Sequence, residues 1–224
     1  MLHVMAYIYF MKAKSSAHYQ REYRKRLRDQ GLVKKEVWIL PENAKQLAVV
    51  EKQFRRLAGE EESIGVSRMT DKTKNWTTNS LYEALQEVEI FVSGEATVEL
   101  IDGVSPALHV IMTGYGDLPI FVTVVGDQII AEAMLWSVAE VADVALFNEA
   151  VLKTHKYFPL STISLDRIVH DSAGHSSDFY HMFGALSSTS ILPNIVFEIE
   201  TLASNVIHAT EAYSEFLSIP VEAS

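Results

Sequence analysis

Residues 96–135, ATVELIDGVSPALHVIMTGYGDLPIFVTVVGDQIIAEAML, decide the fold class. Apolar residues alternate with polar ones along Ala96–Leu100, and a second strand-like run follows at Leu108–Met112. Pro119–Val125 is nearly all apolar, and a Gly-Asp turn connects it to Gln128–Leu135. Four short strands separated by turn residues predict an antiparallel meander whose central strands are covered on both faces.

Three predicted helices and a hairpin surround this meander. The helices cover Asn79–Val88, Val138–His155 and Pro193–Leu217, and the hairpin pairs Thr162–Ile168 with Phe179–Leu186. The last helix keeps an apolar stripe along its whole length: Ile195, Ile199, Leu202, Val206, Ala209, Tyr213 and Phe216. This order of elements predicts an α+β domain, with helices packed on an antiparallel sheet.

The composition narrows the function classes. The chain has 224 residues, 48% of them apolar, and is long enough to bury a sizeable core. It contains no cysteine, which excludes disulfides, thiolate metal sites and a cysteine nucleophile and is compatible with a reducing cytoplasm. The net charge of −10 argues against a general binder of nucleic acids or anionic membranes. We expect a cytoplasmic protein.

The charge is divided unevenly along the chain. Lys12–Leu57 carries 13 basic and 5 acidic residues, whereas Ala58–Ser224 carries 6 basic and 24 acidic residues. A polar segment poor in apolar periodicity separates the two parts. We therefore predict a basic head (1–57), a linker (58–78) and an acidic α+β domain (79–217).

The basic head has the pattern of a helix, a strand and a second helix. His18–Gln30 contains strong helix formers before a glycine, residues 32–40 alternate as a strand, and Glu42–Leu57 is amphipathic after a proline. This order resembles the first half of a ribbon-helix-helix DNA-binding module, whose paired strands from two copies enter the major groove. The resemblance implies a homodimer that binds duplex DNA. The candidate DNA-binding residues are Arg21, Arg24, Lys25, Arg26, Arg28, Lys34, Lys35 and Trp38.

A second interpretation of the head stays open. The basic run is equally typical of a solvated helix face, and the lysines of the strand are typical of an edge protected from aggregation. The charge division favours DNA contact slightly, because it concentrates positive potential in the head while the acidic body limits non-specific binding.

The acidic domain resembles two known groups of proteins. The order of its elements is similar to that of type III secretion chaperones, which are small acidic dimers that bind partner segments. The motifs NWTTNSLYEAL (75–85) and FNEAVLKTHKYFPLSTISL (147–165) resemble the YjfI-like family of uncharacterised bacterial proteins, over about Trp76–Leu217. Members of that family are commonly encoded beside membrane-remodelling proteins of the phage-shock-protein-A type. The resemblance therefore implies a partner of that type and supplies no catalytic residue.

The densest group of chemically reactive side chains lies at the tip of the predicted hairpin. It comprises His170, Asp171, His175, Asp178 and His181. Imidazole and carboxylate groups can bind zinc, but no helical ligand spacing is present, and a hairpin tip is ordinarily polar. His109 and His155 are more typical of half-buried or capping histidines than of a catalytic pair. We predict no enzyme activity, no cofactor and no metal site.

The apolar stretch Met1–Met11 is too short to span a bilayer, which takes about 20 apolar residues. It lacks the layout of a secretory signal. It is either an element that packs on the body or an upstream extension, with Met11 as the start, and we favour the extension. No other stretch has the length of a transmembrane segment.

These patterns together predict a non-enzymatic regulator or adaptor. Its basic head contacts DNA, and its acidic body binds a protein partner. The alternative is a chaperone-like adaptor of a phage-shock-protein-A-type protein that does not bind DNA.

Overall fold

The computed structural model describes residues 14–34, 47, 50, 75–169 and 175–218. By their contacts, the described residues up to Tyr23 group with those from Asn75 onward into one compact unit, called the body below. Arg24–Lys34 belongs to a second unit. The boundaries of head, linker and acidic domain stay a prediction.

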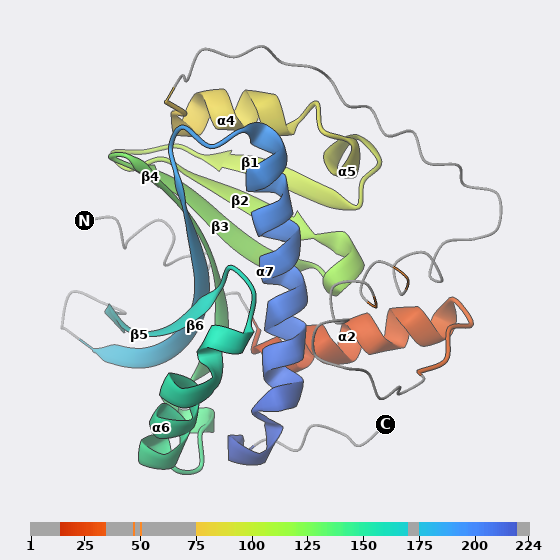
Figure 1. The fold of residues 1–224 in the computed structure, drawn as a ribbon, viewed down its shortest axis with the longest axis vertical. Coiled ribbons are helices and arrows are strands. Elements are labelled where there is room, and N and C mark those ends of the chain that lie inside the picture. Colours follow the sequence, from red (N-terminus) through yellow and green to blue (C-terminus); the bar gives the residue numbers. More distant parts are fainter. Residues whose placement is uncertain (1–13, 35–46, 48–49, 51–74, 170–174, 219–224) are drawn as a thin grey trace. The chain divides into compact units, whose positions relative to one another are not determined.

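A six-stranded antiparallel sheet forms the centre of the body, with the strand order β1-β2-β3-β4-β6-β5 (Figure 1). The strands are β1 (Ala96–Ile101), β2 (Ala107–Met112), β3 (Leu118–Val125), β4 (Gln128–Ser137), β5 (Thr162–Val169) and β6 (Ser176–Ser187). Most of β2 and β3 is buried. The predicted meander, the hairpin and the α+β class are therefore confirmed.

Helices pack on this sheet through one large apolar cluster. They are α2 (Ser16–Asp29), α4 (Thr78–Leu85), α5 (Glu89–Val92), α6 (Val144–Thr154) and α7 (Leu192–Ala212), with single 3-10 turns η2 (Thr113–Tyr115), η3 (Val138–Glu140), η4 (His155–Tyr157) and η5 (Ser214–Phe216). The predicted stripe of α7 lies in the cluster, and its members from Ile195 to Tyr213 are buried. This stripe therefore packs on the protein's own sheet.

The helix predicted from Val138 begins later than the periodicity suggested. Ser137 and Glu140 form a reciprocal capping box around η3, and the chain then leaves the helical conformation at Val141. Asp143 starts α6 instead, because its carboxylate accepts hydrogen bonds from the backbone N–H groups of Ala145 and Leu146. Two competing caps therefore divide one predicted helix into a turn and a helix.

Two further differences concern the ends of elements. The last helix stops at Ala212 rather than at Leu217, and η5 follows it. The predicted linker extends to residue 78, yet Trp76 is fixed in the body, since its indole N–H donates to the Ser190 carbonyl at 2.7 Å. No helix in the described part of the chain is long and apolar enough to cross a membrane.

Candidate functional site

The predicted DNA-contacting helix α2 has an apolar side and a basic side. Tyr19 and Gln20 are buried, and Tyr23 packs against the main cluster. Successive residues of an α-helix are rotated by about 100° about its axis, and by this rotation four cations fall within a sector of about 100° on the other side of the helix. These four are Arg21, Arg24, Lys25 and Arg28. Arg26 lies nearer to the apolar side.

A glycine-containing turn of the body holds the start of α2. Gly116 has a φ of 79°, and a Cβ atom at this position would lie 2.8 Å from the Tyr19 carbonyl oxygen and 2.9 Å from Cβ of Glu22. Next to it, the Tyr115 ring stacks on Tyr23, with the ring planes 6° apart. The turn at Tyr115 and Gly116, which the sequence suggested only as a connection between strands, is therefore also the surface on which the start of α2 packs.

The structure describes six of the eight predicted DNA-binding residues. Lys25 and Arg28 are exposed on α2, Arg21, Arg24 and Arg26 are partly exposed there, and Lys34 is exposed beyond the glycine that ends the helix. Lys35 and Trp38 lie outside the described residues, as does the predicted strand beyond Lys34. Of the predicted second helix, only Leu47 and Val50 are described, and both are helical. The ribbon-helix-helix resemblance therefore stays a prediction.

The hairpin group does not assemble into a site among the described residues. Asp178 accepts two hydrogen bonds from the Arg167 guanidinium, which holds the pKa of that carboxyl below its ordinary value. His175 is exposed and His181 is buried, while His170 and Asp171 lie outside the described residues. No group of three metal-ligating side chains occurs in the part of the chain that the structure describes.

Two histidine–carboxylate pairs that the sequence analysis missed lie on the sheet. His109 on β2 faces Glu99 on β1 at 3.7 Å, and His181 on β6 faces Glu132 on β4 at 3.9 Å. Burial lowers the pKa of His109, although Glu99 acts in the opposite direction. Only the strand register reveals these pairs, so no local motif could have found them.

A buried carboxyl group lies between α7 and β6. Glu198 is 2% exposed, and the position of a Cβ atom on Gly184 would overlap its Oε1 atom. Burial raises the pKa of Glu198 to about 7. Glu198 lies beside the apolar stripe of α7, so the helical periodicity of the sequence could have predicted that this carboxyl group is buried.

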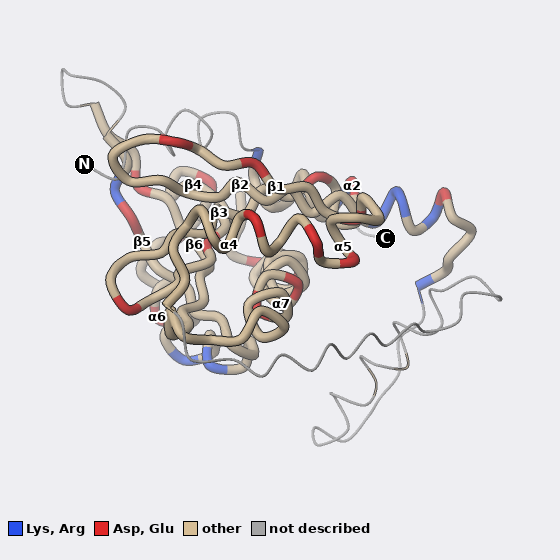
Figure 2. Tube along the Cα trace, turned by 90° about the horizontal axis from the view of Figure 1, so that it is seen from above, with Lys and Arg blue, Asp and Glu red and all other residues tan. Residues whose placement is uncertain are grey.

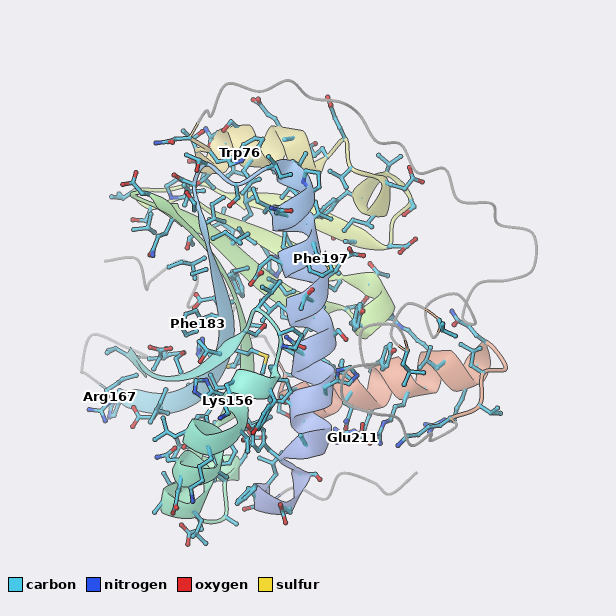
Figure 3. All side chains as sticks on the ribbon, in the orientation of Figure 1. Trp76, Lys156, Arg167, Phe183, Phe197 and Glu211 are labelled. Carbon is cyan, nitrogen blue, oxygen red and sulfur yellow. The ribbon has the colours of Figure 1, made fainter. Side chains whose placement is uncertain are left out.

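The surface of the body is strongly acidic. From residue 75 onward the sequence has 20 acidic residues and three basic ones, Lys153, Lys156 and Arg167. Figure 2 shows acidic positions on most elements of the body and the lysines of α6 and η4 close together. Lys153 forms an ion pair with Glu149, and Arg167, labelled in Figure 3, forms one with Asp178, so two of the three basic side chains of the body are neutralised by acidic neighbours.

These features define a class of protein: an α+β body with helices packed on one antiparallel sheet, a strongly acidic surface and a basic N-terminal helix. Residues 75–217 match the family described as an uncharacterized protein conserved in bacteria (DUF2170), and the chain belongs to this family. The family expected from the two sequence motifs is thereby confirmed.

Two relatives and one solved structure are similar to the body. The uncharacterized protein YjfI of Escherichia coli (strain K12) is 29% identical over 141 residues, which cover 63% of this chain and 97% of YjfI. YjfI of Escherichia coli O157:H7 matches with the same values. The crystal structure of YbjN from E. coli matches with a TM-score of 0.42 and 16% identity, over 62% of this chain and 95% of YbjN.

Proposed function

We propose that the protein is a non-enzymatic regulator in which the basic side of α2 contacts duplex DNA and the acidic body binds a protein partner. The observation that carries this proposal is the separation of charge on α2. One side of the helix packs on the body through Tyr19, Gln20 and Tyr23, while four cations share another side. The helical backbone thus groups these cations on one side before binding.

Phosphate contact is the mode of binding that this helix suits. Lys and Arg side chains at a helix surface neutralise DNA phosphates and release counterions, which gives affinity without reading the sequence. The acidic body opposes general adhesion to DNA, because its 20 acidic residues repel phosphates. Binding should therefore depend on the head and fall with salt.

A pair of charge-matched variants tests this proposal. Lys25→Ala/Arg28→Ala removes two cations from α2, and Lys153→Ala/Lys156→Ala removes two from the body. Gel retardation over a salt series gives the slope of the logarithm of the binding constant against the logarithm of the salt concentration. We expect the first variant to make this negative slope shallower by about 1.8 and the second to leave it unchanged. Absence of salt-sensitive retardation of the intact protein at low ionic strength would overturn the DNA proposal.

For the protein partner we propose a basic amphipathic helix, and a phage-shock-protein-A-type protein is the expected source. An acidic surface favours the encounter with a basic segment, and apolar burial would supply the affinity. Because the α7 stripe is occupied, the contact has to use outward residues such as Phe197, which is 59% exposed (Figure 3).

The partner proposal is tested with the intact chain and a purified phage-shock-protein-A-type protein. Phe197→Ser should weaken binding, and the matched exposed change Val104→Ser, on the β1–β2 loop, should not. Binding to this partner without any binding to DNA would favour the alternative, an adaptor that acts without DNA. Failure to bind it at low salt would remove this partner from the proposal.

A further inference from the structure

A buried carboxyl group of α7 lies against the chain segment that leads into β5. Glu198 is 2% exposed, and its Oε1 atom has no hydrogen-bond partner among the described residues. A Cβ atom on Gly184 would overlap this oxygen and would lie 2.9 Å from the carbonyl oxygen of Leu160. The two oxygens therefore approach the same side of Gly184, and both are only hydrogen-bond acceptors when the carboxyl group is ionised.

Leu160 belongs to residues 158–161, which join η4 to β5 and are called the connection below. Its φ is 60°, in the left-handed region that residues other than glycine rarely adopt. The side chain amide of Asn205 on α7 donates to the Pro159 carbonyl oxygen at 2.8 Å and to the Ser161 hydroxyl oxygen at 2.9 Å. Contacts with α7 thus hold the connection in a conformation that its own backbone disfavours.

The described groups packed around Glu198 offer it no cation. The sheet residues of the large cluster opposite α7 include Ala131, Ala133, Tyr180 and Met182, of which only Tyr180 can ionise, and its hydroxyl donates to Asn148. The positions three and four residues away on α7 are Asn194, Ile195, Thr201 and Leu202. On η4, the His155 ring bonds to Thr162, and the Lys156 ammonium group lies over the Tyr157 ring. An ionised Glu198 would therefore be buried without an opposite charge, next to a carbonyl oxygen, which is unfavourable.

We propose that Glu198 controls the connection through its proton: the protonated carboxyl group donates a hydrogen bond to the Leu160 carbonyl oxygen and keeps the connection closed on α7, and loss of the proton opens it. The body thus contains a pH-sensitive contact between its last helix and the start of its edge strand. The proposal does not rest on the proposed binding of DNA or of a protein partner.

The direction of the pH dependence follows from the two states. In the closed state, burial raises the pKa of Glu198 from 4.5 to about 7. In the open state the carboxyl group regains water and its ordinary acidity, so this state loses the proton first as the pH rises. The ratio of open to closed molecules should therefore increase by up to about tenfold per pH unit between about 4.5 and about 7, and level off above that range.

The chain contains no cysteine, so a single introduced thiol can report the opening. Ser161→Cys places the thiol in the connection, at a position that is 8% exposed, and Val104→Cys provides a reference at a position that is 95% exposed. The labelling rate of the first variant by a thiol reagent is divided by that of the second at each pH, which removes the pH dependence of the thiol itself. This ratio should rise by about 50-fold or more between about pH 5 and about pH 8.

Two further variants separate the proposed contact from other causes of labelling. In Ser161→Cys/Glu198→Gln the ratio should stay constant with pH, because the amide cannot ionise and can still donate to Leu160. Val122→Cys, at a fully buried position of β3, reports unfolding of the whole body. At about pH 8 it should be labelled at least about tenfold more slowly than Ser161→Cys, because the connection opens without the sheet.

The proposal is overturned by a constant ratio in Ser161→Cys, by the same rise in the Glu198→Gln background, or by equal labelling of Ser161→Cys and Val122→Cys. Hydrogen exchange of the unsubstituted chain decides the matter if Ser161→Cys does not fold. After correction for the intrinsic exchange rate, the protection of residues 160–163 should fall as the pH rises in the wild type and stay constant in Glu198→Gln. Parallel protection in the two proteins would equally overturn the proposal.

Discussion

Tyr23 of α2 stacks on Tyr115 of the body, with the ring centroids 5.4 Å apart and the planes nearly parallel. The two residues are far apart in the sequence, and both belong to the body, so their contact fixes the first turns of α2 there. Tyr19 reinforces the same contact, because its carbonyl lies against Gly116. The first turns of the basic helix are thus part of the body's own packing.

A double-mutant cycle should detect the energy of this ring contact. Tyr23→Ala, Tyr115→Ala and the double variant are compared by urea unfolding, and we expect a coupling free energy of about 0.5–1.5 kcal/mol. The single variants should each lower the free energy of unfolding, because each removes buried ring surface. Strictly additive effects would mean that the stacking does not stabilise the protein.

Gly116 and Gly126 provide a matched pair of substitutions to alanine. Both have positive φ angles, 79° and 58°, so both variants carry the strain of a left-handed residue, which costs about 1 kcal/mol. Only at Gly116 does the added Cβ meet another chain segment, the Tyr19 carbonyl oxygen at 2.8 Å. Gly116→Ala should therefore lower the free energy of unfolding by at least about 1 kcal/mol more than Gly126→Ala. If urea unfolding showed equal losses of unfolding free energy for the two variants, the close packing of α2 against Gly116 would be contradicted.

The elements of the fold were predictable because their signals are local. Strands such as Pro119–Val125 are marked by apolar runs between turn residues, and α7 by its 3/4 stripe. The start of α6 was not predictable from periodicity, because Val138–Thr154 is apolar at helical spacing throughout. Between the caps at Ser137 and Asp143 the chain is extended at Val141, which forms a bridge with Leu217 far along the chain, a contact that no local pattern reveals.

The candidate site was predictable only in its charges. The cations of α2 follow from composition and helical propensity, whereas its docking depends on a contact with a turn more than ninety residues away. The register of β4 with β6, which includes an irregularity between Met134 and Trp136, places His181 near Glu132. Glu198 is different, since the helical pattern already placed this charge beside the stripe residues Ile195 and Leu202.

The ribbon-helix-helix resemblance predicts that the protein is a dimer in solution. The predicted strand beyond residue 34 would leave unpaired backbone groups unless a second copy paired with it. Light scattering should give the mass of two chains over the accessible concentration range. A mass of one chain that does not change with concentration would refute the prediction.

The last prediction concerns pH and rests on Glu198. Burial raises the pKa of this carboxyl from its ordinary value of 4.5 to about 7 in the folded protein. Below pH 4.5 both the folded and the unfolded states hold the proton, so the group imposes no penalty. As the pH rises from 4.5 to about 7, the unfolded state loses the proton first, and the free energy of unfolding falls. The fall amounts to at most about 3 kcal/mol and levels off above the folded-state pKa.

Glu198→Gln isolates this contribution, because an amide of nearly the same shape cannot ionise. Urea unfolding at several pH values between about 4.5 and about 9 should show that the wild-type protein loses stability relative to the variant as the pH rises. Asn194→Gln, an exposed change on the same helix that removes no ionisable group, is the control and should follow the wild-type curve. Parallel curves for the wild type and Glu198→Gln would show that Glu198 keeps its ordinary acidity, and the carboxyl would then have to reach water or a partner in the folded protein.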